Sequence, residues 1–170
     1  MLGQFAGDLD EAQRVLKPIR DLKPIVDLWQ PMPYLVVQGL IDPANPNGRR
    51  NYWRAYNVHD VDDGVIDLFI ERAATAPSPF TALITLGMGG AIGRVGEDDT
   101  ALSGRKAPFN VHLDGMWEGD ADEENIEWVR ETTRAFEPHI IPGMALNFIT
   151  EISDHDLESS FGSKLRRLGN

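Results

Sequence analysis

The chain has 170 residues, 42% of them hydrophobic, with a formal net charge of −11 and no cysteine. This composition predicts one globular domain with a real core, and the negative charge argues against binding to nucleic acid or to anionic membrane surfaces. Disulfides and thiolate catalysis are excluded, and because there is neither a signal-peptide pattern nor an apolar run of transmembrane length, we expect a cytoplasmic protein.

Four elements are expected in the first 78 residues. Helix starts are indicated by carboxylates that can cap the first turn, and helix ends by prolines. An aromatic-rich run favours a strand. The four elements are a helix from Asp8 to Pro18, a short helix from Pro33 to Leu40, a strand over 50–58, and a helix capped by Asp60 and stopped by Pro77.

The second half alternates strands and helices. The segment over 120–138 begins with several acidic residues, which favour the start of a helix. Its apolar side is expected to hold Ile126, Val129, Thr133 and Phe136. The predicted elements are a strand over 79–86, a second extended piece over 87–95, a polar loop over 96–107, a strand over 108–117, a helix over 120–138, a strand over 142–152, and a broken helix over 154–168.

The strands alternate in polarity, which strands of a parallel sheet buried on both faces do not do. The sequence therefore predicts an α+β fold, with a mostly antiparallel sheet, helices packed on one face and the other face open. No repeat or linker divides the chain, so we expect a single unit over residues 1–170.

The strand "PFNVHLDGMW" has an unusual polar side. Phe109, Val111 and Leu113 point one way, whereas three residues point the other way: Asn110, His112 and Asp114. These three either face water or line a site. A metal site would need at least a third ligand with an oriented second shell, and the other histidines show no ligand spacing, so no metal is expected.

Two further motifs have structural explanations. In "GMGGAIG" the third glycine of a dinucleotide loop is replaced by Ile92, and no helix is expected to follow, so a turn or bulge is favoured. In "NYWRAY" one face carries Tyr52, Arg54 and Tyr56; aromatic residues in a strand more often belong to the core or to cross-strand pairs than to a ligand cage. No serine lies in a nucleophile elbow.

Taken in order, several segments resemble one family. The chain over about residues 7–168 is similar to the C-terminal half of bacterial FAD-linked oxidases of the berberine bridge enzyme type. The segments that carry the resemblance are "MPYLVVQGLID", "NPNGRRNYWRA", "APSPFTALITLGMGGAIGRVGEDDTALSGRKAPFNVHLDGMW", "NIEWVRETTRAFEP", "MALNFI" and "FGSKLRRL".

The resemblance implies an antiparallel substrate domain whose uncovered face closes over a flavin held by a separate FAD domain. It implies oxidation of a small organic substrate by hydride transfer to FAD. On this interpretation His112 accepts a proton and Asn147 orients the substrate. The residues expected to bind substrate are Tyr52, Arg54, Tyr56, Asn110 and Asp114.

Two departures from the family pattern leave a second interpretation open. The sequence contains no segment matching the FAD domain, and Ala145 stands where many members have a tyrosine. We therefore do not expect the chain to turn over alone, and a partner chain would have to supply FAD. The alternative is a non-catalytic binding or dimerisation module that self-associates through its open sheet face, and homo-oligomers are expected.

Overall fold

The computed structural model describes residues 1–101, 103–143 and 146–169, so the family-pattern position Ala145 lies outside the described residues. The chain divides into two compact units, Met1–Pro46 and Asn47–Asn170, and each is described by itself. No helix in the described part of the chain combines the length and the apolar character that crossing a membrane requires.

The first unit is built on helix α1, Leu9–Asp21. The Asp8 carboxylate caps this helix by accepting hydrogen bonds from the N–H groups of Asp10 and Glu11, as predicted. The prediction that Pro18 ends the helix is wrong, because α1 continues through the proline for three residues. An ion pair between Lys17 and Asp21 spans the added turn.

The rest of the first unit is short and has little core. Helix α2, Tyr34–Gln38, begins directly after Pro33, and a 3-10 turn, η1, covers Asp42–Ala44. Among the described residues of this unit, Leu16 is the one buried hydrophobic side chain. The order of the unit therefore depends on local turns and ion pairs more than on burial.

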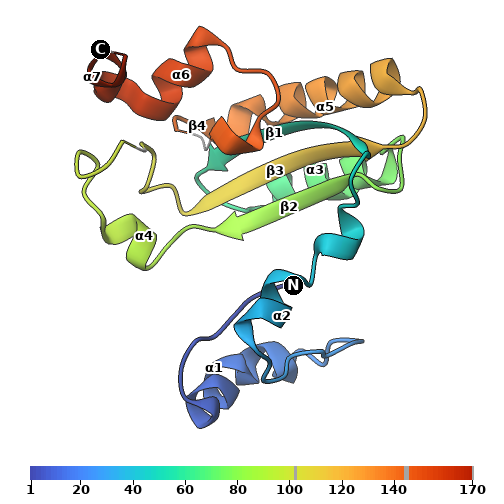
Figure 1. The fold of residues 1–170 in the computed structure, drawn as a ribbon, viewed down its shortest axis with the longest axis vertical. Coiled ribbons are helices and arrows are strands. Elements are labelled where there is room, and N and C mark those ends of the chain that lie inside the picture. Colours follow the sequence, from blue (N-terminus) through green and yellow to red (C-terminus); the bar gives the residue numbers. More distant parts are fainter. Residues whose placement is uncertain (102, 144–145, 170) are drawn as a thin grey trace. The chain divides into compact units, whose positions relative to one another are not determined.

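The second unit holds a four-stranded antiparallel sheet with strand order β2-β3-β1-β4 (Figure 1). Its strands are β1 Arg50–Val58, β2 Ala82–Gly87, β3 Phe109–Trp117 and β4 Ile140–Ile141. The prediction of an α+β fold with an antiparallel sheet is confirmed. The long central pair β3–β1 forms the scaffold on which the candidate residues sit.

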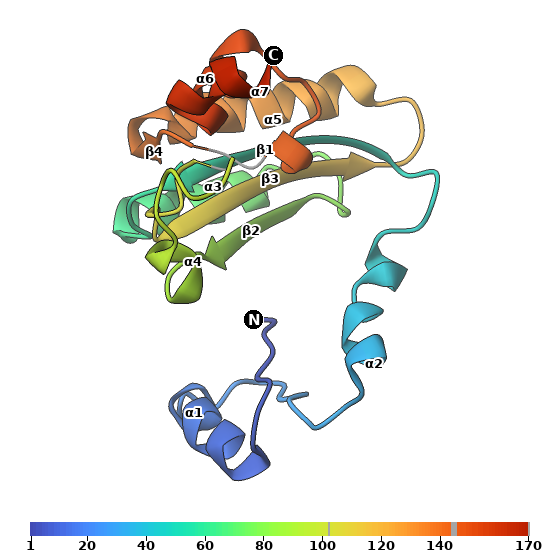
Figure 2. The same cartoon turned by 60° about the vertical axis from the view of Figure 1, so that its left-hand side comes forward.

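Two helices cover one face of this sheet (Figure 2). They are α3, Asp63–Ala74, and α5, Asp122–Phe136. The side chains of Val65, Val129 and Phe136 are fully buried against Val111 and Leu113 of β3. The apolar side of the "PFNVHLDGMW" strand therefore faces the helices, as its alternation predicts.

Both helices differ in detail from the prediction. The cap of α3 is Asp62, two residues beyond the expected Asp60, and its carboxylate accepts the N–H of Val65. The buried side of α5 is rotated from the predicted stripe, because Trp128 and Thr132 are buried whereas Ile126 and Thr133 are only partly so. The rotation brings the larger Trp128 ring into the core.

Two predicted extended segments are wrong. After Gly90, with φ of 66°, residues Ala91–Arg94 form a single helical turn, α4, instead of a strand. The predicted strand over 142–152 is broken by Pro142 and by Gly143, whose φ is 95°. Beyond this break the chain forms a 3-10 turn, η3, over Leu146–Phe148.

The chain then returns to the edge of β1. Thr150 and Trp53 exchange two hydrogen bonds, of 3.0 Å to the Trp53 carbonyl and 2.9 Å from its N–H. The broken terminal helix is found as predicted: α6 Asp154–Phe161 with a capping box, a 3-10 turn η4 over Gly162–Lys164, and α7 Leu165–Leu168. Gly162, with φ of 53°, makes the break.

Candidate functional site

Four polar side chains lie in a row on the sheet face that α3 and α5 leave uncovered. We call Asn57, Asn110, His112 and Asp114 the polar row. Asn110 pairs with Asn57 across β3 and β1, and His112 lies between Ala55 of β1 and Ile84 of β2. These positions alternate with Val111 and Leu113, whose side chains enter the helix-covered core.

The row is buried although it carries hydrogen-bonding groups. Asn110, His112 and Asp114 are only 3%, 4% and 6% exposed. Burial of this kind is costly unless each polar atom has a partner.

Several atoms of the row have no partner among the described residues. The Asn110 amide donates a 2.9 Å hydrogen bond to Asn57 Oδ1. Asn110 Oδ1, His112 Nε2 and Asp114 Oδ1 are buried without any hydrogen bond. His112 Nδ1 lies 3.9 Å from Asp114 Oδ1, which is too long for a hydrogen bond. The row therefore presents acceptors and one imidazole nitrogen that a ligand could satisfy.

Burial also changes the protonation of the pair. It raises the pKa of the Asp114 carboxyl from 3.8 to about 7 and lowers the pKa of His112 below its usual 6.5, in each case by disfavouring the charged form. Both shifts therefore favour the neutral imidazole of His112 and the protonated carboxyl of Asp114 more than exposure would. An imidazole in this state can accept a proton, and the neighbouring carboxyl can supply a compensating charge.

Two aromatic side chains, Phe148 and Trp53, adjoin the row. The rings of Phe148 and His112 are 4.5 Å apart between centroids, in an edge-on arrangement. Phe148 belongs to η3, and the chain contacts β1 before this turn through Ile140 and Ile141 and after it through Thr150. Trp53 lies opposite Asp114, and its buried indole N–H has no hydrogen-bond partner among the described residues.

Asn147 differs from its predicted position. The sequence pattern predicts it on a strand beside His112, but it lies in the η3 turn and is exposed. Its neighbour Phe148 is the residue of this turn that contacts His112. Within the described residues no hydrogen bond joins Asn147 to the polar row, so its role in orienting a substrate remains a prediction.

The three other predicted substrate residues lie on the opposite face of the sheet. Arg54 pairs with Leu113 and Tyr56 with Val111, so both share the face that packs against α5, as does Tyr52. Tyr52 and Tyr56 are buried in the core cluster. The cross-strand register therefore separates these three residues from His112, and their role in binding a substrate remains a prediction.

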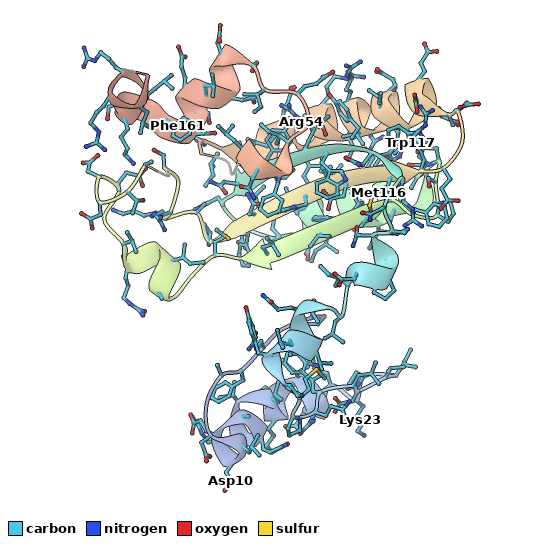
Figure 3. All side chains as sticks on the ribbon, viewed as in Figure 1. Asp10, Lys23, Arg54, Met116, Trp117 and Phe161 are labelled. Atoms are coloured by element: carbon cyan, nitrogen blue, oxygen red, sulfur yellow. The ribbon has the colours of Figure 1, made fainter. Side chains whose placement is uncertain are left out.

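On that side the three residues do line a common cavity. Arg54 lies on β1 among the side chains drawn in Figure 3. It donates a 2.7 Å hydrogen bond to Tyr56 Oη, a 2.6 Å bond to the Glu151 carbonyl, and a 3.3 Å bond to Asp156. Tyr52 Oη donates to the Glu151 carboxylate at 2.7 Å. Tyr52 and Arg54 of β1 thus hold Glu151, which lies between η3 and α6.

The sequence pattern did not single out three residues at or beside the polar row: Asn57, Trp53 and Phe148. Asn57 and Trp53 have the parity of Ala55 on β1, but only the register with β3 shows that this parity faces His112. Phe148 arrives through an irregular turn that has no periodic signal. In the part of the chain that the structure describes, no three His, Asp or Glu side chains converge on a possible metal position.

No family model matches the sequence. The chain is similar to a hexose oxidase from Chondrus crispus, with 31% identity over 107 residues. This match covers 58% of the present chain and 20% of the relative. The chain therefore corresponds to a small part of that oxidase, and the similarity relates it loosely to an oxidoreductase.

Proposed function

We propose that the second unit, residues 47–170, is a substrate-binding domain of an FAD-dependent oxidoreductase, and that its polar row meets a small hydroxylated substrate. The observation that carries this proposal is the set of partnerless buried atoms on Asn110, His112 and Asp114. Native proteins rarely leave such atoms unpaired without a functional reason. The similarity to a hexose oxidase supports an oxidase rather than another class.

The polar row does not fit the dinucleotide part of FAD. A pyrophosphate is bound by cationic side chains or by the N–H groups of a helix start. The row offers two amides, an imidazole and a carboxyl, and burial favours the uncharged form of the last two. FAD would therefore be held by another domain or chain, and it would supply the hydride acceptor for the reaction.

The part of this chain in such a reaction is positioning and proton transfer. Neutral His112 would take the proton of a substrate hydroxyl on Nε2, the nitrogen that has no partner in the described chain. Ionised Asp114, 3.9 Å from Nδ1, would stabilise the imidazolium that results. Asn110 Oδ1 would accept a hydrogen bond from a second hydroxyl, which fixes the substrate against the sheet.

Binding of a hexose to the row tests this proposal. D-glucose should shift the amide NMR signals of Asn110, His112 and Asp114 and the imidazole signals of His112. His112→Ala should abolish the amide shifts. Asp120→Asn serves as the control, because the Asp120 side chain is 99% exposed and has no assigned role in the row. Absence of saturable shifts on the row, or equal shifts in the His112 variant, would refute the assignment of substrate to this face.

The cofactor part of the proposal has a separate test. FAD added to the purified chain should leave the flavin absorption spectrum unchanged, because the row holds no cationic group for the pyrophosphate. A stoichiometric yellow protein would show that residues of this chain hold the cofactor.

A non-catalytic dimerisation module is the second candidate function. β2 is one of the two edge strands of the sheet, and its Ile84 and Leu86 are exposed on the same face as the polar row. Residues 77–93 carry no charged side chain in a chain of net charge −11. Edge strands of most proteins are protected by charges or prolines, so an uncharged apolar edge favours strand pairing between copies.

A further inference from the structure

A second cavity lies on the helix-covered side of the sheet, apart from the polar row. It has a volume of about 350 Å³ and is bounded by β1, α5 and the residues that lead into α6. Its polar lining includes Tyr52, Arg54, Arg130, Thr133, Glu151 and Asp156. A hollow of this size accommodates a small organic molecule.

The carboxylate of Glu151 already accepts the hydrogen bonds of two donors in this cavity, Tyr52 and Arg130. Glu151 accepts a 2.7 Å hydrogen bond from Tyr52 Oη, and its two oxygens lie 3.2 and 3.4 Å from Arg130 Nη2. The side chains of Glu151 and Arg130 are 60% and 45% exposed. Ion pairs at this exposure are weak, so an external carboxylate can displace Glu151 from these donors.

The floor of the cavity is formed by Arg54, which is held in place by several partners. Arg54 has a side chain only 16% exposed and is held by Tyr56, the Glu151 carbonyl and Asp156. Its contact with the backbone of Glu151 does not depend on the Glu151 side chain. The donor geometry would therefore survive when the Glu151 carboxylate moves out.

Two groups of α5 complete the lining. Arg134 lies one turn after Arg130, and its Nη2 is paired with Glu127 at 2.7 Å. Thr133 Oγ1 is buried and has no hydrogen-bond partner in the described chain. The lining holds three guanidinium groups, but Arg134 is paired with Glu127 and Glu131 and Arg54 with Asp156, so the cation that Glu151 leaves when it moves out is Arg130.

We propose that this cavity is a binding site for a small organic monocarboxylate, whose carboxylate replaces that of Glu151 on Tyr52 and Arg130. The ligand body would then contact Thr133 and lie above Arg54. This inference does not depend on the function proposed for the polar row, which lies on the other face of the sheet. A dianion such as phosphate fits less well, because Asp156 adds a negative charge to the floor.

The pKa shifts of Tyr52 and Glu151 agree with this assignment. Burial and the neighbouring Glu151 raise the pKa of Tyr52, so its hydroxyl keeps the proton that it donates. The hydrogen bond from Tyr52, followed by that from Arg130, lowers the pKa of Glu151. The position therefore favours an ionised carboxylate over a neutral acid.

The test uses acetate as the probe and the full chain as the protein. Acetate is titrated at constant ionic strength against chloride, and the amide NMR signals of the lining residues are followed. Glu151→Ala removes the internal competitor while the backbone contact to Arg54 remains. We expect it to bind acetate about tenfold more tightly than the wild type, a gain typical of one charge-assisted hydrogen bond.

A second pair of variants separates the site from general charge effects. In the Glu151→Ala background, Arg130→Ala should weaken acetate binding about tenfold or more, because a hydrogen bond to a charged group is lost. Arg14→Ala also removes one arginine from an ion pair, but that pair lies in the first unit. It should leave acetate binding unchanged.

Three results would overturn the proposal. The first is equal acetate affinity in wild type and Glu151→Ala when both retain the native amide spectrum. The second is an equal effect of the Arg14 and Arg130 substitutions. The third is tighter binding of inorganic phosphate than of acetate, which would assign the cavity to a different anion class. If Glu151→Ala loses the native spectrum, Glu151→Gln replaces it, and the same three criteria apply.

Discussion

The buried carboxyl of Asp114 makes a sharp prediction about stability. Its side chain is largely inaccessible, with 6% of the residue exposed, and one of its oxygens has no partner among the described residues. Burial raises its pKa from 3.8 to about 7. Because the pKa of Asp114 is higher in the folded state than in the unfolded state, its contribution to the free energy of unfolding is fully present below pH 4. This contribution is lost as the pH rises through about 7.

The size of this loss follows from the shift. A difference of about three pKa units, at 1.36 kcal/mol each, sets an upper value of about 4 kcal/mol above pH 7. An asparagine side chain has the same shape as that of Asp114 without the charge, so Asp114→Asn should raise the free energy of unfolding at pH 8 by about 2–4 kcal/mol. Near pH 4 the two proteins should be almost equal.

Urea unfolding at pH 8 and pH 4, followed by tryptophan fluorescence, measures this difference. Three tryptophans of the second unit, including Trp117 and Trp128 in the core, report on the fold around the row. Asp120→Asn is the control, since the Asp120 side chain is 99% exposed, and it should change stability little at either pH.

His112 acts in the opposite direction. Burial lowers its pKa, so its contribution to stability is present above pH 6.5 and is lost as the pH falls through the lower folded-state value. This contribution is common to the wild type and Asp114→Asn. If Asp114→Asn is no more stable than the wild type at pH 8, the carboxylate has a stabilising partner and the burial argument is incorrect.

Three further predictions concern the cover, the edge and the core of the sheet. Phe148→Ala should move the pKa of His112 up towards its usual value, since the ring shields the imidazole from water, and an NMR titration that gives the wild-type pKa would assign the shielding to other residues. Sedimentation of the wild type at high micromolar concentration should reveal self-association that Ile84→Lys weakens; a wild-type monomer would contradict pairing through β2. Gly115→Ala should lower the free energy of unfolding by about 1–3 kcal/mol, because its Cβ would lie 2.6 Å from a side-chain atom of α5, whereas Gly87→Ala, with open space around it, is the neutral control in the same urea assay.

The strands of the central pair were predictable because their periodicity is strong. The runs at 50–58 and 108–117 alternate over nine or more residues, and the structure places β1 and β3 there. Alternation alone also assigned His112 and Leu113 to opposite faces of β3. A period of two is set by local backbone geometry, so it does not depend on the rest of the fold.

Irregular segments were not predictable in the same way. Residues 142–152 are rich in apolar and β-branched types, which favours a strand. The pairing that would realise this preference stops at Ile141, because Pro142 lacks an N–H group and Gly143 takes a positive φ. The contact of Phe148 with His112 depends on this interruption and has no signature in the sequence pattern.

The division of the candidate residues into two sites follows from register, which periodicity does not determine. Each strand has two sides, but the pairing of Arg54 with Leu113 decides which side of β1 joins which side of β3. A shift of one residue would bring Tyr52 and Tyr56 out of the core and onto the face of the polar row. Burying each ring is worth about 2 kcal/mol, so such a shift would lose much of the core stabilisation. The burial that fixes the register therefore also separates the cavity around Arg54 from the polar row. A ligand bound on one face of the sheet makes no direct contact with a ligand on the other face.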